Sequence, residues 1–389
     1  MIRTGLERIL LDDGPSLEGL RLGLLSNQAS TDHRLRHARL LLQQRFGDRL
    51  TCLFSPQHGF FSEKQDNMVE SGHAVDSETG LPLYSLYGET RRPTPEMFEP
   101  IDVLLIDLVD VGTRVYTFLY TMAYCLEEAA RMGRKVIVLD RPNPIGGAVI
   151  EGNILRPEWA SFVGLYPLPM RHGLTFGELA LFINGEAGLN SDLEVVPMQG
   201  WQRTMLFRDT GLPWVFPSPN MPTPETALVY PGQVIWEGTN VSEGRGTTLP
   251  FELVGAPYWD CRDILGVLER TPLPGCFLRP LLFEPTSGKW AQQTCAGFQL
   301  HVTDSAVFKP YRTSLALLQA TLELYPQTFR YKQPPYEYEF ERLPLDLILG
   351  DAGIRRQLEA GVSVLAVEAD WQRELAAFDL LRARYFLYD

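Results

Sequence analysis

Polar side chains that bind ligands or transfer protons follow four apolar runs in the first 145 residues. The runs cover residues 20–25, 53–54, 103–106 and 136–139. The side chains that follow them include Asn27, Gln57, His58, Asp110, Arg114, Tyr116, Arg141 and Asn143. If the runs are parallel strands, these clusters lie at the carboxyl edge of one sheet, where open α/β sheets bind ligands. The alternative is that polar residues follow strands simply because loops are hydrated.

Two of these clusters have residue types suited to acid–base chemistry. A proline and a glycine flank Gln57 and His58, which would aim both side chains into a pocket; in the alternative, His58 caps a carbonyl of a tight turn. In the next cluster, Asp107 or Asp110 could pair with Arg114 and stay ionised while the other faces a substrate. A purely structural Asp–Arg pair is the alternative there.

The densest polar segment of the chain is 237–248, which combines acids, an amide, hydroxyls, an arginine and glycines. Sugar recognition needs such a mixture of neutral donors and acceptors with a carboxylate, and glycines let the backbone approach a ligand. We therefore expect Glu237, Asn240 and Arg245 at a carbohydrate site, unless the segment is an irregular linker. Asn220 and His172 are further candidates, although His172 fits a buried core histidine equally well.

The elements that must position these residues alternate between strands and helices. Strands are expected near 20–26, 51–55, 102–107, 135–139 and 193–197, and helices near 34–46, 116–132 and 176–184. This rhythm predicts a doubly wound, Rossmann-like, mainly parallel sheet of the α/β class. Thr175 and Glu178 have the spacing of a helix N-cap and its partner.

The second half of the chain has a different pattern. Prolines between 213 and 231 predict an extended connector that resists helix formation. We expect residues 1–232 to form the Rossmann-like domain and residues 233–389 a smaller α+β domain that closes a cleft, with a strand near 297–303 and helices near 315–324 and 371–385. The long polar loop 62–79 has the length of a functional lid.

Composition excludes several classes of function. The net charge of −13 argues against nucleic-acid and anionic-membrane partners, which need basic patches. Apolar runs long enough to span a membrane and a signal-peptide core are absent from the sequence, which predicts a cytoplasmic protein. The five cysteines form no CxxC pair, and neither GxGxxG, GxxxxGK[ST] nor HExxH occurs. We therefore expect no nucleotide cofactor and no metal; the sequence leaves the oligomeric state open.

Taken in order, the motifs resemble the NamZ-like exo-β-N-acetylmuramidases, a bacterial family of glycoside hydrolases. They include Ser-Pro-Gln-His-Gly, Asp-Arg-Pro-Asn-Pro and Glu-Gly-Thr-Asn-Val-Ser, and they lie at 25–28, 55–59, 79–88, 92–97, 107–112, 139–144, 217–222 and 237–242. The resemblance implies an active site in the cleft between a Rossmann-like domain and a smaller C-terminal domain. It also implies release of N-acetylmuramic acid from the non-reducing ends of peptidoglycan fragments, without a metal or nucleotide.

The sequence departs from the family pattern at residue 57, where Gln57 replaces the glutamate that is the family's proposed catalytic acid. An amide does not donate and recover a proton near neutral pH, as a carboxylic acid does. Candidates for a replacement acid are Glu63 and Glu70 in the following loop, together with Asp110 and Glu237.

Three hypotheses follow. The first is a glycosidase in which Arg141, Asn143, Asn240 and Arg245 hold the sugar and its lactyl carboxylate. The second is a catalytically silent protein that binds sugars or muropeptides, which the amide at Gln57 favours. The third is a Rossmann-like enzyme that acts on another carboxylated small molecule.

Overall fold

The computed structural model describes residues 2–61, 64, 68–88 and 90–389. Within these residues the largest sheet has seven strands in the order β3-β4-β2-β1-β5-β6-β9, and only β3 runs antiparallel to its neighbour. Their bounds are β1 Leu22–Ser26, β2 Leu50–Ser55, β3 Ala74–Val75, β4 Pro82–Ser85, β5 Val103–Asp107, β6 Lys135–Leu139 and β9 Asp192–Val196. The strand order reverses between β1 and β5, as in doubly wound folds.

Helices cover both faces of this sheet because successive strand residues point to opposite sides. Leu24 packs with α1 (Gly5–Leu10) and α2 (Ala38–Phe46), whereas Leu25 belongs to the core formed with α4 (Phe118–Met132) and α5 (Phe176–Glu186). The short helix α3 (Pro95–Phe98) contacts α4. Strands buried on both faces read as continuous apolar runs. The predicted Rossmann-like sheet is thereby confirmed.

The N-terminus of α5 forms where the sequence predicts it. The Thr175 side chain accepts a hydrogen bond from the backbone N–H of Glu178, and the Glu178 side chain accepts one from the backbone N–H of Thr175. This reciprocal pair satisfies two N–H groups that lack partners inside the helix.

The proline-rich segment has neither helix nor strand from 212 to 223, but α6 (Pro224–Gln233) is helical, so the expected extended connector is wrong for its second part. Pro224 occupies the first turn, where its missing N–H needs no partner, and Thr223 caps the helix by accepting from Thr226 N–H. Pro231 lies only two residues before the helix ends. Prolines therefore mark the start and the end of this helix rather than preventing it.

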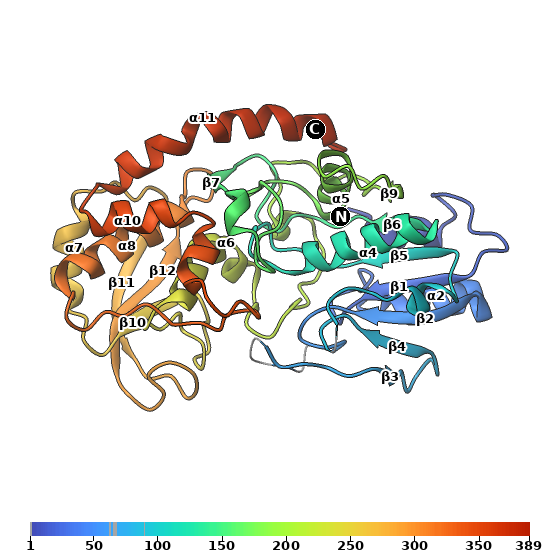
Figure 1. Cartoon of the computed structure of the whole chain (residues 1–389), viewed down its shortest axis with the longest axis horizontal. Helices are drawn as coiled ribbons and strands as arrows, with labels where there is room; N and C mark the ends of the chain where they lie inside the picture. Colours follow the sequence, from blue (N-terminus) through green and yellow to red (C-terminus); the bar gives the residue numbers. More distant parts are fainter. Residues whose placement is uncertain (1, 62–63, 65–67, 89) are drawn as a thin grey trace.

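The C-terminal half has a three-stranded antiparallel sheet in the order β10-β12-β11, among the described residues. Its elements are β10 Leu253–Ala256, α7 Cys261–Leu268, β11 Cys276–Phe283, β12 Cys295–Val302, α8 Pro310–Leu324, α9 Pro344–Leu349, α10 Ala352–Glu359 and α11 Val364–Arg382. Figure 1 shows this sheet and the large sheet at opposite ends of the molecule, with α11 running along the top between them. The strand expected near 297–303 and the helices near 315–324 and 371–385 correspond to β12, α8 and α11.

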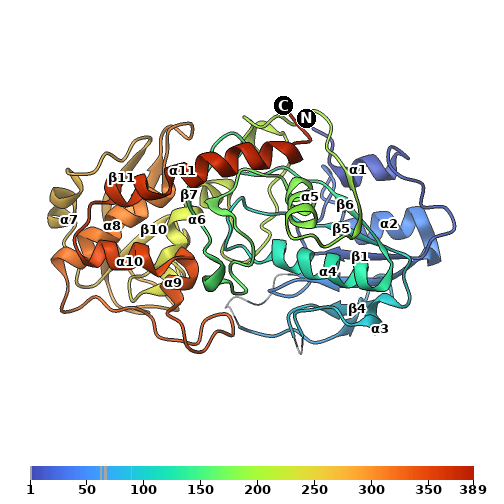
Figure 2. The same cartoon turned by 45° about the horizontal axis from the view of Figure 1, so that its top comes forward.

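The last helix joins the two halves. From the end of α11, Arg382 Nη1 donates to the backbone oxygens of Gly147 and Gly173, and Tyr388 Oη donates to the carboxylate of Asp140. In Figure 2 the C-terminal end of α11 lies beside the termini and the large-sheet half. A small sheet of β7 (Glu151–Ile154) and β8 (Pro169–Arg171) lies under α11. Across residues 2–61, 64, 68–88 and 90–389, none of the helices is both long and apolar enough to cross a membrane.

Candidate active site

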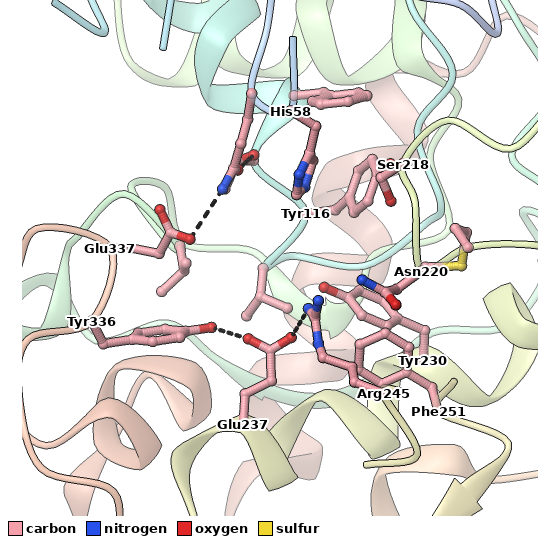
Figure 3. Close-up of a pocket in the computed structure, with 16 residues that line it drawn as sticks. His58, Tyr116, Ser218, Asn220, Tyr230, Glu237, Arg245, Phe251, Tyr336 and Glu337 are labelled. Atoms are coloured by element: carbon pink, nitrogen blue, oxygen red, sulfur yellow. Dashed lines mark hydrogen bonds and ion pairs between the residues drawn. The ribbon is translucent and has the colours of Figure 1, made fainter. Parts of the chain in front are cut away.

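Loops from both halves line one pocket, which is partly open to solvent (Figure 3). From the large-sheet half come the loop after β2 and the segment between β5 and α4, with Gln57, His58, Tyr116 and Thr117. The remaining polar lining comes from the segment around α6 and from the C-terminal half: Ser218, Asn220, Tyr230, Glu237, Arg245, Tyr336 and Glu337.

Glu237 lies in the 3₁₀ turn η4 (Val234–Gly238) and is held as an anion. Arg245 Nη2 donates to its Oε1 at 2.6 Å, and Tyr336 Oη donates to its Oε2 at 2.7 Å. Burial opposes the charge, but the ion pair and the tyrosine outweigh it and hold the pKa of Glu237 below its ordinary value. Glu237, Glu243, Arg245 and Lys289 form a network of two negative and two positive charges.

Glu337 is a second carboxyl in the pocket, with the opposite electrostatic character. It is 5% exposed, and Gln57 Nε2 donates to its Oε1 at 3.1 Å while Tyr87 Oη donates to its Oε2 at 2.7 Å. Burial raises the pKa of Glu337, the charge of Glu237 acts in the same direction, and the two hydrogen bonds only partly oppose them. Two carboxyl groups with opposite pKa shifts are typical of acid–base sites.

The backbone of the pocket is locally strained. His58, Phe251 and Glu337 have φ angles of 74°, 63° and 46°, in the left-handed region that side chains other than glycine rarely adopt. Such conformations cluster at functional sites, because the surrounding structure must enforce them. At Gly238 the chain passes so close to α9 that a Cβ would lie 2.6 Å from Leu345 Cα. This close approach packs the turn of Glu237 against the helix that follows the loop of Glu337.

Six of the residues predicted from the sequence line the pocket together: Gln57, His58, Tyr116, Asn220, Glu237 and Arg245. In Figure 3, Glu237 and Glu337 lie on adjacent sides of the pocket with Tyr336 beside them, and His58 and Tyr116 lie across from Glu237. His58 Nδ1 donates to the backbone oxygen of Lys64, which fixes its ring.

Asp110 and His172 form a buried pair outside the pocket lining. His172 Nε2 lies 3.3 Å from Asp110 Oδ2, and His172 Nδ1 accepts from Leu174 N–H, so the proton is on Nε2. Asp110 also accepts from the backbone N–H of Gly112. Neither side chain lines the pocket, and Asp110 Oδ1 and His172 Nε2 are buried without a hydrogen-bond partner among the described residues.

The structure does not bring the other predicted binding residues to this pocket. Asn27 and Asn240 donate to the backbone oxygens of Pro217 and Thr328, and Asn143 donates to that of Leu174. Arg114 is fully buried and donates to four backbone oxygens. Arg141 pairs with the carboxylate of Asp107. These five side chains hold loops and strand ends together. Of the four polar clusters that follow strands, only those after β2 and β5 contribute residues to the pocket.

Of the two acids proposed in the loop after Gln57, Glu63 lies outside the described residues. Glu70 is exposed, does not line the pocket and accepts a hydrogen bond from Tyr338 Oη at 3.1 Å.

Sequence reasoning missed Glu337, Tyr336 and Tyr230. Glu337 belongs to the run Tyr-Glu-Tyr-Glu at 336–339, whose alternation suggests an ordinary half-exposed strand. The run instead forms a tight turn in which Tyr336 and Glu339 exchange backbone hydrogen bonds. Two prolines just before this run indicate a rigid loop, and they were the sequence feature that could have pointed to it.

The protein is of the α/β class, with a Rossmann-like sheet and a smaller domain that contains an antiparallel sheet. Its pocket has two buried carboxyls and an arginine and is suited to a polar, carboxylated ligand. The chain belongs to the exo-β-N-acetylmuramidase NamZ family: the N-terminal family model matches residues 22–225 and the C-terminal model residues 228–388.

Similar proteins support this assignment over the whole chain. A peptidoglycan β-N-acetylmuramidase NamZ of Bacillus subtilis strain 168 is 44% identical over 387 residues, covering 100% of this chain and 91% of the relative. Two crystal structures of DUF1343 family proteins from Bacteroides fragilis have the same fold. Their TM-scores are 0.89 and 0.79 at 35% and 29% identity, and each match covers 100% of this chain and 99% of the other.

Proposed function

We propose that this protein is a glycoside hydrolase that releases N-acetylmuramic acid from the non-reducing end of peptidoglycan fragments. The single observation that carries the proposal is a pocket with two buried carboxyls of opposite pKa shift, in a chain of this family. Glycosidases generally need such a pair, one group to protonate the leaving oxygen and one negative charge near the anomeric carbon. The cytoplasmic location expected from the sequence stays a prediction.

Arg245 gives the pocket a partner for the lactyl carboxylate that distinguishes N-acetylmuramic acid from N-acetylglucosamine. It is the only lysine or arginine among the described residues that line the pocket. A guanidinium has five N–H donors; Nη2 of Arg245 donates to Glu237, and Nε lies 3.4 Å from Glu243 Oε1. The remaining donors suit a planar carboxylate.

Turnover of a chromogenic β-glycoside of N-acetylmuramic acid tests this function. We expect the wild-type protein to release the dye and to act much more slowly on the matching N-acetylglucosamine glycoside, which lacks the carboxylate for Arg245. Absence of turnover at high enzyme concentration would contradict the proposal. Calorimetry on the same sample then tests the alternative of a catalytically silent binding protein. Tight binding of a muropeptide without cleavage would identify such a protein.

A further inference from the structure

The pocket contains an amide at the position from which the family's proposed acid would act. Hydrolysis of a sugar–sugar bond requires a proton for the departing oxygen, because an alkoxide is a poor leaving group. Gln57 has no proton to give. A carboxyl group in contact with Gln57 would be the group best placed to donate that proton.

Glu337 is in that contact and is also one of the residues that line the pocket. A carboxylate has about four acceptor positions, and the bonds from Gln57 and Tyr87 take two of them. Thr117 Oγ1 donates to Gln57 Oε1, which turns the amide so that its nitrogen faces Glu337. These hydrogen bonds hold the carboxyl group in position at the wall of the pocket that Glu337 lines.

The surroundings of Glu337 favour a neutral carboxylic acid. The negative charge of Glu237 lies nearby, and the positive charge of Arg91 acts as a weaker opposing influence. Among the described residues, four phenols also interact with Glu337: Tyr87, Tyr230, Tyr336 and Tyr338. Because burial disfavours the charged form, the folded protein keeps a proton on this carboxyl at a pH where a solvated glutamate has lost it.

The other acidic residues of this region are less suited to donate a proton to the departing oxygen. Glu237 is ionised by its pairing with Arg245, Asp110 is buried against His172, and Glu70 is exposed. None of these three touches Gln57 among the contacts of the described residues.

We propose that Glu337 is the general acid of this enzyme and that Gln57 positions it, so that the C-terminal half supplies the proton that residue 57 does not. This inference rests on the proposed function. In the reaction the bond from the anomeric carbon to the bridging oxygen breaks. Its electron pair stays on that oxygen, which takes the proton from Glu337. The oxygen of a water molecule forms the new bond to the anomeric carbon, and a proton released from that water restores Glu337 to its acid form.

The test compares Glu337→Gln with Glu341→Gln, the same substitution at an exposed position four residues along the same loop. Each is assayed on the disaccharide of N-acetylmuramic acid β-linked to N-acetylglucosamine and on the 4-nitrophenyl glycoside, whose leaving group needs no proton. For Glu337→Gln we expect kcat/KM on the disaccharide to fall roughly 10²–10⁴-fold, with a loss at least about tenfold smaller on the nitrophenyl glycoside. Glu341→Gln should leave kcat/KM on both substrates unchanged.

Folding is checked by the melting temperature, and we expect Glu337→Gln to fold because burial favours the uncharged form. Glu337→Asp provides a second variant, since it keeps a carboxyl and should retain more disaccharide activity than Glu337→Gln. Wild-type-like activity of Glu337→Gln on the disaccharide, or equal losses on both substrates, overturns the role of Glu337 while the proposed function stands. A wild-type protein inactive on both substrates overturns the function itself, and the assignment of Glu337 with it.

Discussion

The side chains of Gln57 and Glu337 are separated by 280 positions in the chain and meet at 3.1 Å between Nε2 and Oε1. An amide can serve as a neutral donor to a carboxyl group in either protonation state. A glutamate at position 57 would instead place two carboxyl groups at hydrogen-bond distance. Two such groups do not ionise independently, and their pKa values separate. Burial raises the pKa of Glu337 and the amide of Gln57 partly opposes this shift, so the residue at position 57 modulates the proton affinity of Glu337.

Gln57→Glu is therefore expected to change the pH dependence of the reaction. One carboxyl of the new pair should have a higher pKa than Glu337 has now, so an acid form persists to higher pH. The decline of kcat/KM on the alkaline side should move upward by about one pH unit or more. The measurement is kcat/KM for the disaccharide from acid to alkaline pH, for the variant and the wild type. An unchanged profile would show that these carboxyls do not interact during catalysis.

At the scale of elements, helix ends connect the large sheet to the loops around it. The hydroxyl of Thr175 caps α5 and also donates to Asp140 Oδ2, just after β6. Asp140 in turn accepts from Gly177 N–H at 2.7 Å in the first turn of α5, and burial raises the pKa of this carboxyl group to about 7. The end of a central strand and the beginning of a helix are thus joined by one small network.

Thr175→Ala removes both hydrogen bonds in a buried site. We expect the free energy of unfolding to fall by about 1–3 kcal/mol, which urea denaturation measures. Thr175→Ser keeps the hydroxyl and should retain most of the stability, so it is the matched control. Because α5 does not line the pocket, KM should not change. Equal stability of the alanine and serine variants would contradict this account of the cap.

At the scale of the whole molecule, buried arginines connect the two halves. Arg114 follows β5, and its Nη1 donates to the backbone oxygens of Asn153 and Leu168. Its Nη2 donates to those of Ile348 and Leu349 at the end of α9. Since α9 follows the loop of Glu337 and packs on the turn of Glu237, this guanidinium helps to fix the carboxyl-bearing segments against the large sheet.

Arg114→Met leaves these buried carbonyl groups without the donor, and an unsatisfied buried polar group costs about 1–3 kcal/mol. We expect a loss of at least about 3 kcal/mol in the free energy of unfolding. Arg270→Met, which breaks an exposed pair with Glu323, is the control and should cost at most about 1 kcal/mol. Urea denaturation compares the two variants, and similar losses would rule out the proposed role of Arg114 in joining the halves.

Local patterns were sufficient to predict most of the first half. Short apolar runs mark strands of five or six residues that are covered on both faces of the sheet. The spacing of Thr175 and Glu178 forms a helix cap from neighbouring atoms alone. The strand ends also contributed Gln57, His58 and Tyr116 to the pocket. The prediction of an extended connector was wrong from residue 224 on, because prolines near both ends of a segment are compatible with a capped helix.

Periodicity and capping act between residues close together in the chain, so the alternation of strands and helices can be predicted from local patterns. Which polar residues form the site depends instead on contacts between distant segments. Asn143 and His58 both follow strands, but only His58 lines the cavity. The side chain of Asn143 packs against Gly112, so closely that a Cβ there would lie 2.5 Å from Asn143 Oδ1. The contact of Glu337 with Gln57 likewise depends on how two distant loops pack, and no local pattern encodes the burial that sets the proton affinity of a carboxyl group.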